Sequence, residues 1–203
     1  QKNVTVLLGS GYRRDTAGRR GTPFTIFSRT LDRHWLNGGS TWVVDRSTLA
    51  TVVADAVLES GDPSKTYRYV PMFAPGTAAL VPRGASAALV DELRAHERPL
   101  EQLPLSRGRF AATGRLAHRF SSSTLRLEER LYADTWRVLA STTDLQYVVD
   151  VHRRLSAGPH LRAHVQSGAD FWQRASELVP GPGGQLVAPA LRTGDRELGP
   201  LYT

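Results

Sequence analysis

Five side chains that carry a charge or a hydroxyl group stand at every second position of one short stretch. They are Arg126, Glu128, Arg130, Tyr132 and Asp134. The positions between them hold leucine and alanine, with Glu129 as the exception. Because successive side chains of a β-strand point to opposite faces, period-two alternation indicates a strand. We therefore expect one charged face, able to pair ions or line a polar space, and one mostly apolar face.

A helix is the competing interpretation of residues 123–136. Ser123 or Thr124 followed by a glutamate resembles a capping box, and Leu, Glu and Arg are good helix formers. On a helix, however, Leu125 and Leu127 would lie about 200° apart. A strand places both on one face, so the strand is favoured.

The same alternation recurs along the chain and predicts further strands. They cover 3–12, 22–44 (one long bent strand or two short ones), 48–59, 109–120, 138–155 and 160–172, with the start of another near 195–202. Short turns are expected at 45–47, 121–123 and 156–158, and longer connections at 13–22, 60–106, 134–137 and 173–194. A short helix is expected within the long connection, at 85–97.

Short turns and long connections thus alternate, which in an up-and-down meander places them at opposite ends. This is typical of an outer-membrane β-barrel. We predict an all-β fold, an antiparallel up-and-down transmembrane β-barrel, with residues 1–203 as a single, partial barrel domain of a longer polypeptide. Apolar and polar residues also alternate along the strands of a soluble sandwich or lipocalin-like barrel, so this alternative interpretation remains. Glu129 does not suit a lipid face, and a bulge or a position near the rim would accommodate it.

Composition excludes several kinds of chemistry. The 203 residues include no cysteine, so disulfides, zinc–thiolate sites and thiol catalysis are excluded. No apolar run reaches the roughly 18–20 residues of a membrane-spanning helix, and no signal peptide is visible. The formal charge of +7 comes almost entirely from arginine. These arginines are spread over alternating strands, so nucleic-acid binding is not expected.

No catalytic, metal or cofactor site is predicted. His160 and His164 share a face but would lie about 13 Å apart along a strand, too far to share one metal ion. The glycine-rich loop 181–184 lacks the lysine and the strand–helix context of a phosphate loop. Ser, His and Asp residues are present without a nucleophile motif.

The polar face carries the candidate functional residues. They are Arg109, Arg115, Arg119, Arg126, Glu128, Arg130, Tyr132, Asp134, Asp144, Asp150, Arg162, His164, Gln166 and Asp170. Two roles are compatible with this set. The charges can pair across strands and hold the register, or they can line a conduit in which the arginine excess favours anions.

Residues 127–172 resemble the DUF3570 family of predicted outer-membrane β-barrel proteins. The matching elements are Tyr132-x-Asp134-x-Trp136, then Thr142-x-Asp144, then Arg162, Gln166, Asp170 and Phe171. Residues 58–70 are similar, more loosely, to a further element of the family through Asp62, Pro63, Tyr67 and Arg68. Residues 192–202 resemble the start of a following strand.

The resemblance implies a barrel in the outer membrane of Gram-negative bacteria and implies no reaction. It leads us to expect a porin-like conduit, or the membrane component of a larger surface or export assembly, with outer-membrane lipid as its partner. Two alternatives remain. One is a scaffold that binds other envelope or surface proteins through 60–106 and 173–194, and the other is a soluble periplasmic β-sheet protein.

Overall fold

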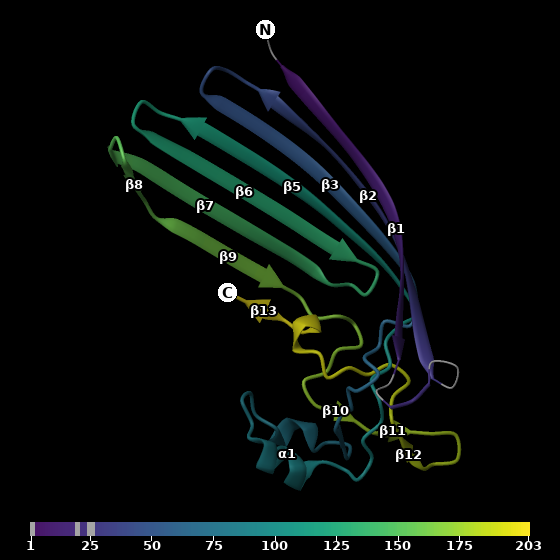
Figure 1. The fold of residues 1–203 in the computed structure, drawn as a ribbon. Coiled ribbons are helices and arrows are strands. Elements are labelled where there is room, and N and C mark those ends of the chain that lie inside the picture. Colours follow the sequence, from purple (N-terminus) through teal and green to yellow (C-terminus); the bar gives the residue numbers. More distant parts are fainter. Residues whose placement is uncertain (1–2, 19–20, 24–26) are drawn as a thin grey trace.

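The computed structural model describes residues 3–18, 21–23 and 27–203, and it consists mainly of one antiparallel sheet (Figure 1). The nine strands of this sheet are β1 (Val4–Gly18), β2 (Ser28–Val43), β3 (Thr48–Gly61), β5 (Ser106–Arg119), β6 (Ser123–Asp134), β7 (Leu139–His152), β8 (Leu155–Ala157), β9 (His160–Gln166) and β13 (Leu201–Tyr202). They follow one another in chain order, with β8 paired to β7 beside β9. The predicted antiparallel β fold is confirmed.

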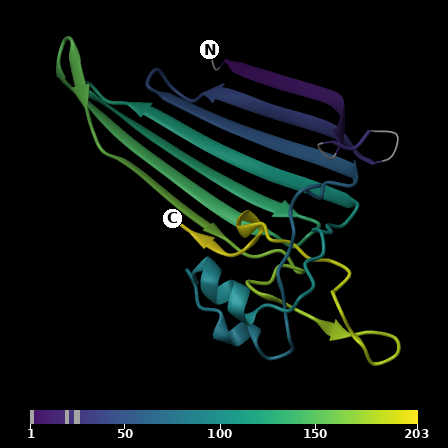
Figure 2. The ribbon, with the colours of Figure 1, turned by 60° about the horizontal axis from the view of Figure 1, so that its bottom comes forward.

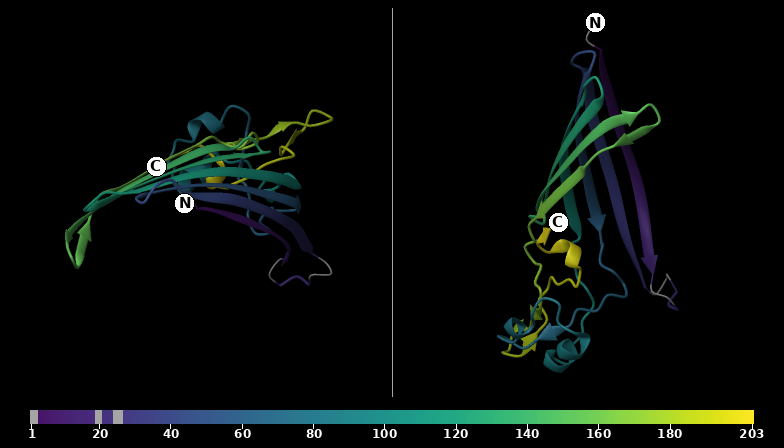
Figure 3. Two further views of the ribbon diagram at one scale, coloured as in Figure 1. Left: turned by 90° about the horizontal axis from the view of Figure 1, so that it is seen from above. Right: turned by 90° about the vertical axis from the view of Figure 1, so that its left-hand side faces the viewer.

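The sheet is curved and open in the part of the chain that the structure describes. Figure 3 shows the curvature from above and from the side. Strand β1 forms one edge, while β9 and its short partner β13 form the other. The described residues therefore form one large open antiparallel sheet and no closed barrel.

Two predicted boundaries near the N-terminus are wrong. The connection expected at 13–22 begins only after Gly18, because the charges that suggested a loop are paired across strands. Arg14 binds Asp32 at 2.7 Å, and Arg33 binds Asp15 at 2.8 Å. The stretch 22–44 forms one strand, β2, from Ser28 onward, and its positions 24–26 lie outside the described residues.

The turn expected at 156–158 is also misplaced. The chain reverses at 153–154, and both β8 and β9 then pair with β7. Residues 158–159 interrupt this returning strand, because Pro159 has no N–H to donate to the ladder. A Cβ atom on Gly158 would come within 1.8 Å of the Tyr147 carbonyl oxygen, so the two backbones approach closely here.

Three other elements are shorter than expected. Strand β9 ends at Gln166 instead of continuing to 172, and only Leu201–Tyr202 of the last stretch is extended. The helix expected at 85–97 is present as α1 (Ala87–Leu93). The Ser86 hydroxyl caps it by accepting a hydrogen bond from the Leu89 amide at 3.2 Å.

The connections 62–105 and 167–200 fold together at one end of the sheet, and we call them the loop cluster (Figure 2). Besides α1 the loop cluster holds β4 (Met72–Phe73), a 3-10 turn at Ala78–Leu80, β10 (Ser176–Glu177), β11 (Val179–Pro180), β12 (Leu186–Val187) and a second 3-10 turn at Arg196–Leu198. Strands β4 and β10 pair in parallel, and β11 and β12 pair antiparallel. Segments more than a hundred residues apart in sequence therefore meet here.

Most of the buried apolar core lies in the loop cluster. It comprises Val70, Met72, Phe73, Val81, Leu103, Ala169, Leu178 and Leu198, joined by Trp136 and Val138 from the β6–β7 turn. Among the described strands of the large sheet, only Leu31 and Ala111 are buried apolar residues. The sheet thus contributes little to a core of its own.

Gly61→Ala is expected to destabilise the end of β3. Gly61 has a φ of +120°, and an added Cβ would lie 2.2 Å from the Thr30 carbonyl oxygen. Such strain costs about 1–3 kcal/mol of unfolding free energy, measurable from urea midpoints in detergent. Gly114→Ala in β5 is the matched control, because no described atom lies within 4 Å of its added Cβ. Equal urea midpoints for the two variants would contradict the claim that a side chain at position 61 strains the backbone.

Candidate functional site

The register divides the large sheet into two chemically different faces, because residues directly opposite each other share a face. One face, the apolar face, carries exposed hydrocarbon. It includes Val6, Leu8, Leu36, Val52, Phe110, Leu116, Leu127, Leu131, Leu139, Leu145, Leu161 and Val165. Leu8 is 79% exposed and Leu161 is 64% exposed. No element in the described part of the chain covers this face.

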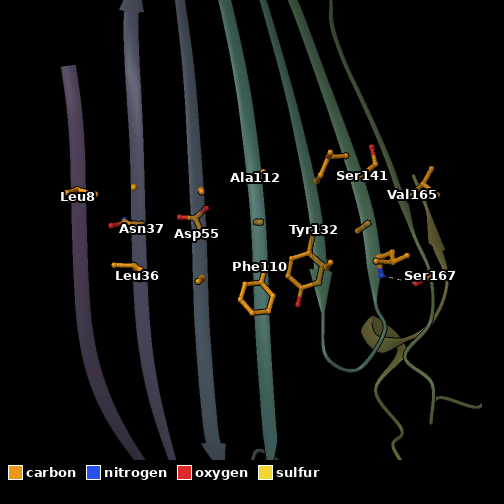
Figure 4. Close-up of a pocket in the computed structure, with 18 residues that line it drawn as sticks. Leu8, Leu36, Asn37, Asp55, Phe110, Ala112, Tyr132, Ser141, Val165 and Ser167 are labelled. Atoms are coloured by element: carbon orange, nitrogen blue, oxygen red, sulfur yellow. Dashed lines mark hydrogen bonds between the residues drawn. The ribbon is translucent and has the colours of Figure 1, made fainter. Parts of the chain in front are cut away.

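Figure 4 shows a hollow on the apolar face, with a volume of about 1030 Å³. Small residues such as Gly38, Ala54 and Ala112 line it, between larger side chains that include Leu8 and Phe110. Asn37, Asp55 and Tyr132 also border it, although the register assigns their side chains to the opposite face. The hollow suits an apolar chain better than a polar solute.

The other face, the charged face, is bound together by ion pairs between strands. The ion pairs are Arg115–Glu128 at 2.5 Å, Arg130–Asp55 at 3.2 Å, Arg33–Glu59 at 3.0 Å, Arg109–Glu59 at 2.7 Å, and Arg119–Asp150. A hydrogen bond of 2.9 Å joins His160 to Asp144 in the same way. Because each pair joins two strands, the charges fix the register as well as neutralising one another.

All the polar residues predicted from the sequence lie on the charged face except Asp170. The residues that share it are Arg109, Arg115, Arg119, Arg126, Glu128, Arg130, Tyr132, Asp134, Asp144, Asp150, Arg162, His164 and Gln166. Asp170 lies beyond the end of β9, where its amide donates to the Trp136 carbonyl at 3.0 Å and its carboxylate pairs with Arg137 at 3.3 Å. Its predicted place on a strand is wrong because β9 ends at Gln166.

Two arginines of the charged face lack an acidic partner among the described residues. Arg126 donates a long hydrogen bond of 3.4 Å to Gln146, and Arg162 makes no ion pair. Sequence reasoning missed Arg33, Glu59 and Arg107 as members of this face. Their parity could have identified them once the boundaries of β2, β3 and β5 were known.

Asp134 is the most heavily bonded group at the end of the charged face. Its fully buried carboxylate accepts hydrogen bonds from the Trp136 and Val138 amides, both at 2.9 Å. It also accepts from Arg107 Nε at 2.9 Å and from the Tyr132 hydroxyl at 3.0 Å. The Arg107 guanidinium lies 4.1 Å above the Trp136 ring. The Tyr-x-Asp-x-Trp element therefore builds the β6–β7 turn.

Trp136 and Gln166 connect this turn and β9 to the loop cluster. Trp136 Nε1 donates to the Ser106 carbonyl at 2.9 Å, and its ring meets Phe171 edge to face at 5.3 Å. Gln166 Nε2 donates to the carbonyl oxygens of Glu197 at 2.7 Å and Gly199 at 3.0 Å. These side chains attach the loop cluster to the rim of the sheet.

A second buried network lies within the loop cluster itself. Glu101 is fully buried and accepts hydrogen bonds from the Lys65 amide at 2.9 Å, the Thr193 hydroxyl at 2.6 Å and Arg68 at 3.2 Å. Arg68 also binds Asp195 at 2.6 Å. Burial alone would raise the pKa of Asp195, but the hydrogen bonds from Arg68 and from the Glu197 amide outweigh it, so the pKa lies below its usual value.

The model of a family described as "Protein of unknown function (DUF3570)" matches residues 1–178. The chain belongs to the DUF3570 family. No curated protein and no solved structure matches it. In this DUF3570 protein the matched range includes Asp134, Trp136 and Gln166, which join the sheet to the loop cluster.

Two other features are absent from the described part of the DUF3570 chain. It contains no helix that combines the length and the apolar character needed to cross a membrane. It also contains no group of three His, Asp or Glu side chains placed to hold a metal ion. His164 instead shares a hydrogen bond of 2.7 Å with the Thr142 hydroxyl.

Asp134→Asn is expected to cost about 3–5 kcal/mol of unfolding free energy, because it leaves the partly buried Arg107 without its counter-charge. Glu128→Gln is the matched control. Its pair with Arg115 is largely exposed and should contribute less than about 1 kcal/mol. Urea midpoints of both variants measure the difference, and an equal loss in the two would show that Asp134 is not the anchor described.

Proposed function

We propose that the protein is an outer-membrane β-barrel component. Its apolar face contacts lipid, its charged face lines a polar interior, and the loop cluster covers one end. The interior serves as a conduit of the porin type, alone or as the membrane part of a larger surface or export assembly.

The observation that carries this proposal is the large uncovered apolar face. Soluble monomers seldom expose a contiguous apolar patch of more than a few hundred Å². Here seven neighbouring strands present leucine, valine, alanine and aromatic side chains to the outside, while the protein buries its own core in the loop cluster. Lipid hydrocarbon is a solvent that suits such a face.

The height of the apolar face also fits a bilayer. Tyr147 shares a row across the sheet with Thr48, and Tyr12 shares another with Leu58. These aromatic-bearing rows lie ten residues apart along β3, or about 33 Å along the strand at 3.3 Å per residue. At a strand tilt of about 40° the height is about 25 Å, which is the height of the apolar band in such barrels.

Among the described residues, Glu129 is the one acidic residue within this band. The expected bulge or rim position is wrong, because β6 pairs without interruption on both sides and Glu129 lies near its middle. Its carboxylate instead accepts hydrogen bonds from the hydroxyls of Ser141 and Thr143, both at 2.5 Å. Gly114 opposite leaves open space beside it. The two hydroxyl groups thus replace some of the hydrogen bonds to water that the carboxylate would lose in lipid.

A barrel in lipid requires both edges of the sheet to be paired. Unpaired backbone N–H and C=O groups cost several kcal/mol each in hydrocarbon, so open sheets do not span bilayers. The proposal therefore includes further strands that pair with β1 and with β9, and their number determines whether the interior is open or filled.

The charged face determines whether an open interior prefers anions or cations. Its acids are engaged in ion pairs or, for Asp144, in a hydrogen bond with His160, whereas Arg126 and Arg162 have no acidic partner among the described residues. Unpaired guanidinium groups lower the energy of an anion and raise that of a cation. The proposed conduit therefore favours small anions.

Leu8→Arg is expected to impair membrane insertion, and Leu7→Arg is its matched control. The two residues are adjacent in β1, point to opposite faces and are 79% and 61% exposed. An arginine on the lipid face near the bilayer midplane costs about 2–4 kcal/mol, whereas one on the charged face does not meet lipid. Flotation with liposomes and heat-modifiable gel migration measure folded insertion.

Loss of insertion in both Leu variants, or in neither, would contradict the assignment of the faces. A wild-type chain that stays soluble and monomeric without detergent would contradict the membrane location altogether.

Replacing both unpaired arginines, Arg126→Gln and Arg162→Gln, is expected to lower the anion-to-cation permeability ratio severalfold in planar bilayers. Arg46→Gln, in the β2–β3 turn, is the control and should leave the ratio unchanged. Correctly inserted protein that conducts no ions would contradict the conduit. It would favour the alternative function, a scaffold whose loop cluster binds a partner protein.

A further inference from the structure

The loop cluster encloses a second cavity, of about 500 Å³, which the proposed conduit does not use. One wall comes from residues 70–90 and the other from residues 172–201, segments that only the fold brings together. A volume of this size lies within the range of small-molecule sites.

The apolar part of the cavity is held in place before any ligand arrives. Phe73 and Trp172 both line it. Phe73 is paired with Glu177 in the parallel β4–β10 ladder, and its carbonyl accepts from the Leu178 amide at 2.8 Å. Trp172 Nε1 donates to the Asp195 carbonyl at 2.9 Å. Fixed aromatic walls reduce the ordering cost of binding.

The charged part of the cavity is entirely basic. Arg83, Arg174 and Arg196 line it from three separate segments, and its lining residues include no aspartate or glutamate. None of the three arginines makes an ion pair within the described part of the chain. Two acids close to them along the chain have other partners, since Asp195 binds Arg68 and Glu177 accepts from the Ala78 amide at 3.0 Å.

From this combination we infer that the cavity is a binding site for a small organic anion with a flat apolar body, such as an aromatic carboxylate. The guanidinium groups bind the carboxylate through charge-assisted, bidentate hydrogen bonds, while the apolar body packs against Trp172, which is partly exposed. Phe73 is only 2% exposed and supports the lining from within. This inference does not depend on the conduit, because every lining residue of the cavity except Leu201 of β13 lies in the loop cluster.

The first test compares two probes on the wild-type full chain in a neutral detergent. The probes are 4-(trifluoromethyl)phenylacetate and the neutral 4-(trifluoromethyl)phenylacetamide, which have the same apolar body. Fluorine NMR line broadening is expected to show at least tenfold weaker binding of the amide. Equal binding of the two probes, or no binding of either, overturns the inference.

The second test removes the charges. The triple variant Arg83→Gln, Arg174→Gln, Arg196→Gln is expected to weaken carboxylate binding at least tenfold while the amide is unaffected. Arg46→Gln removes a charge at the opposite end of the sheet and should leave the binding of both probes unchanged. Unchanged carboxylate binding in the triple variant, or an equal loss in Arg46→Gln, overturns the inference. Because the probe comparison needs no variant, it decides the question even if the triple variant misfolds.

Discussion

The buried carboxylate of Asp134 is the interaction on which the arrangement of the molecule depends. It holds the β6–β7 turn through two backbone amides and binds Arg107 of β5 across the sheet. By fixing the turn, it presents Trp136 to the core of the loop cluster. The same group therefore ends a strand, orders an ion-pair ladder and attaches the loop cluster to the sheet. Without it, Arg107 would be a partly buried charge with no partner.

A second constraint follows from where the protein places its apolar side chains. Of the twelve buried apolar residues described, eight lie in the loop cluster and two in the β6–β7 turn, and the apolar face of the large sheet contains none. In water such a face would be a site of aggregation. In the proposed membrane location, lipid would cover this face, and the ion pairs of the charged face would hold the strands together on the other side of the sheet.

Much of the sheet could be predicted from the sequence, because odd and even positions of a strand place their side chains on opposite faces. Arg126, Glu128 and Arg130 lie on one face as their spacing indicates, whatever strand they pair with. The extent of β1 could not be predicted in this way. Arg14 and Asp15 resemble a polar loop, and only their partners Asp32 and Arg33, far along the chain, make them part of a strand.

The loop cluster escaped prediction for a related reason. Its core is assembled from single residues of distant segments, such as Met72, Leu103 and Leu178, which leave no periodic pattern. The anchoring role of Asp134 was also hidden, because a local pattern shows the spacing of the Tyr-x-Asp-x-Trp element but not the Arg107 that completes it. Whether a residue stands at an odd or an even position of a strand can be read from the local sequence. The side chains that it contacts come from distant segments, which only the fold brings together.

The most direct test of the account is a spin-label scan along β3 in liposomes. The chain has no cysteine, so single cysteines at positions 50–56 can each carry the only label. We expect labels at Ala50, Val52, Ala54 and Ala56 to collide mainly with dissolved oxygen, which concentrates in lipid. Labels at Thr51, Val53 and Asp55 should collide mainly with a water-soluble nickel chelate. The absence of this two-residue alternation, or its reversal, would contradict a lipid-facing apolar face.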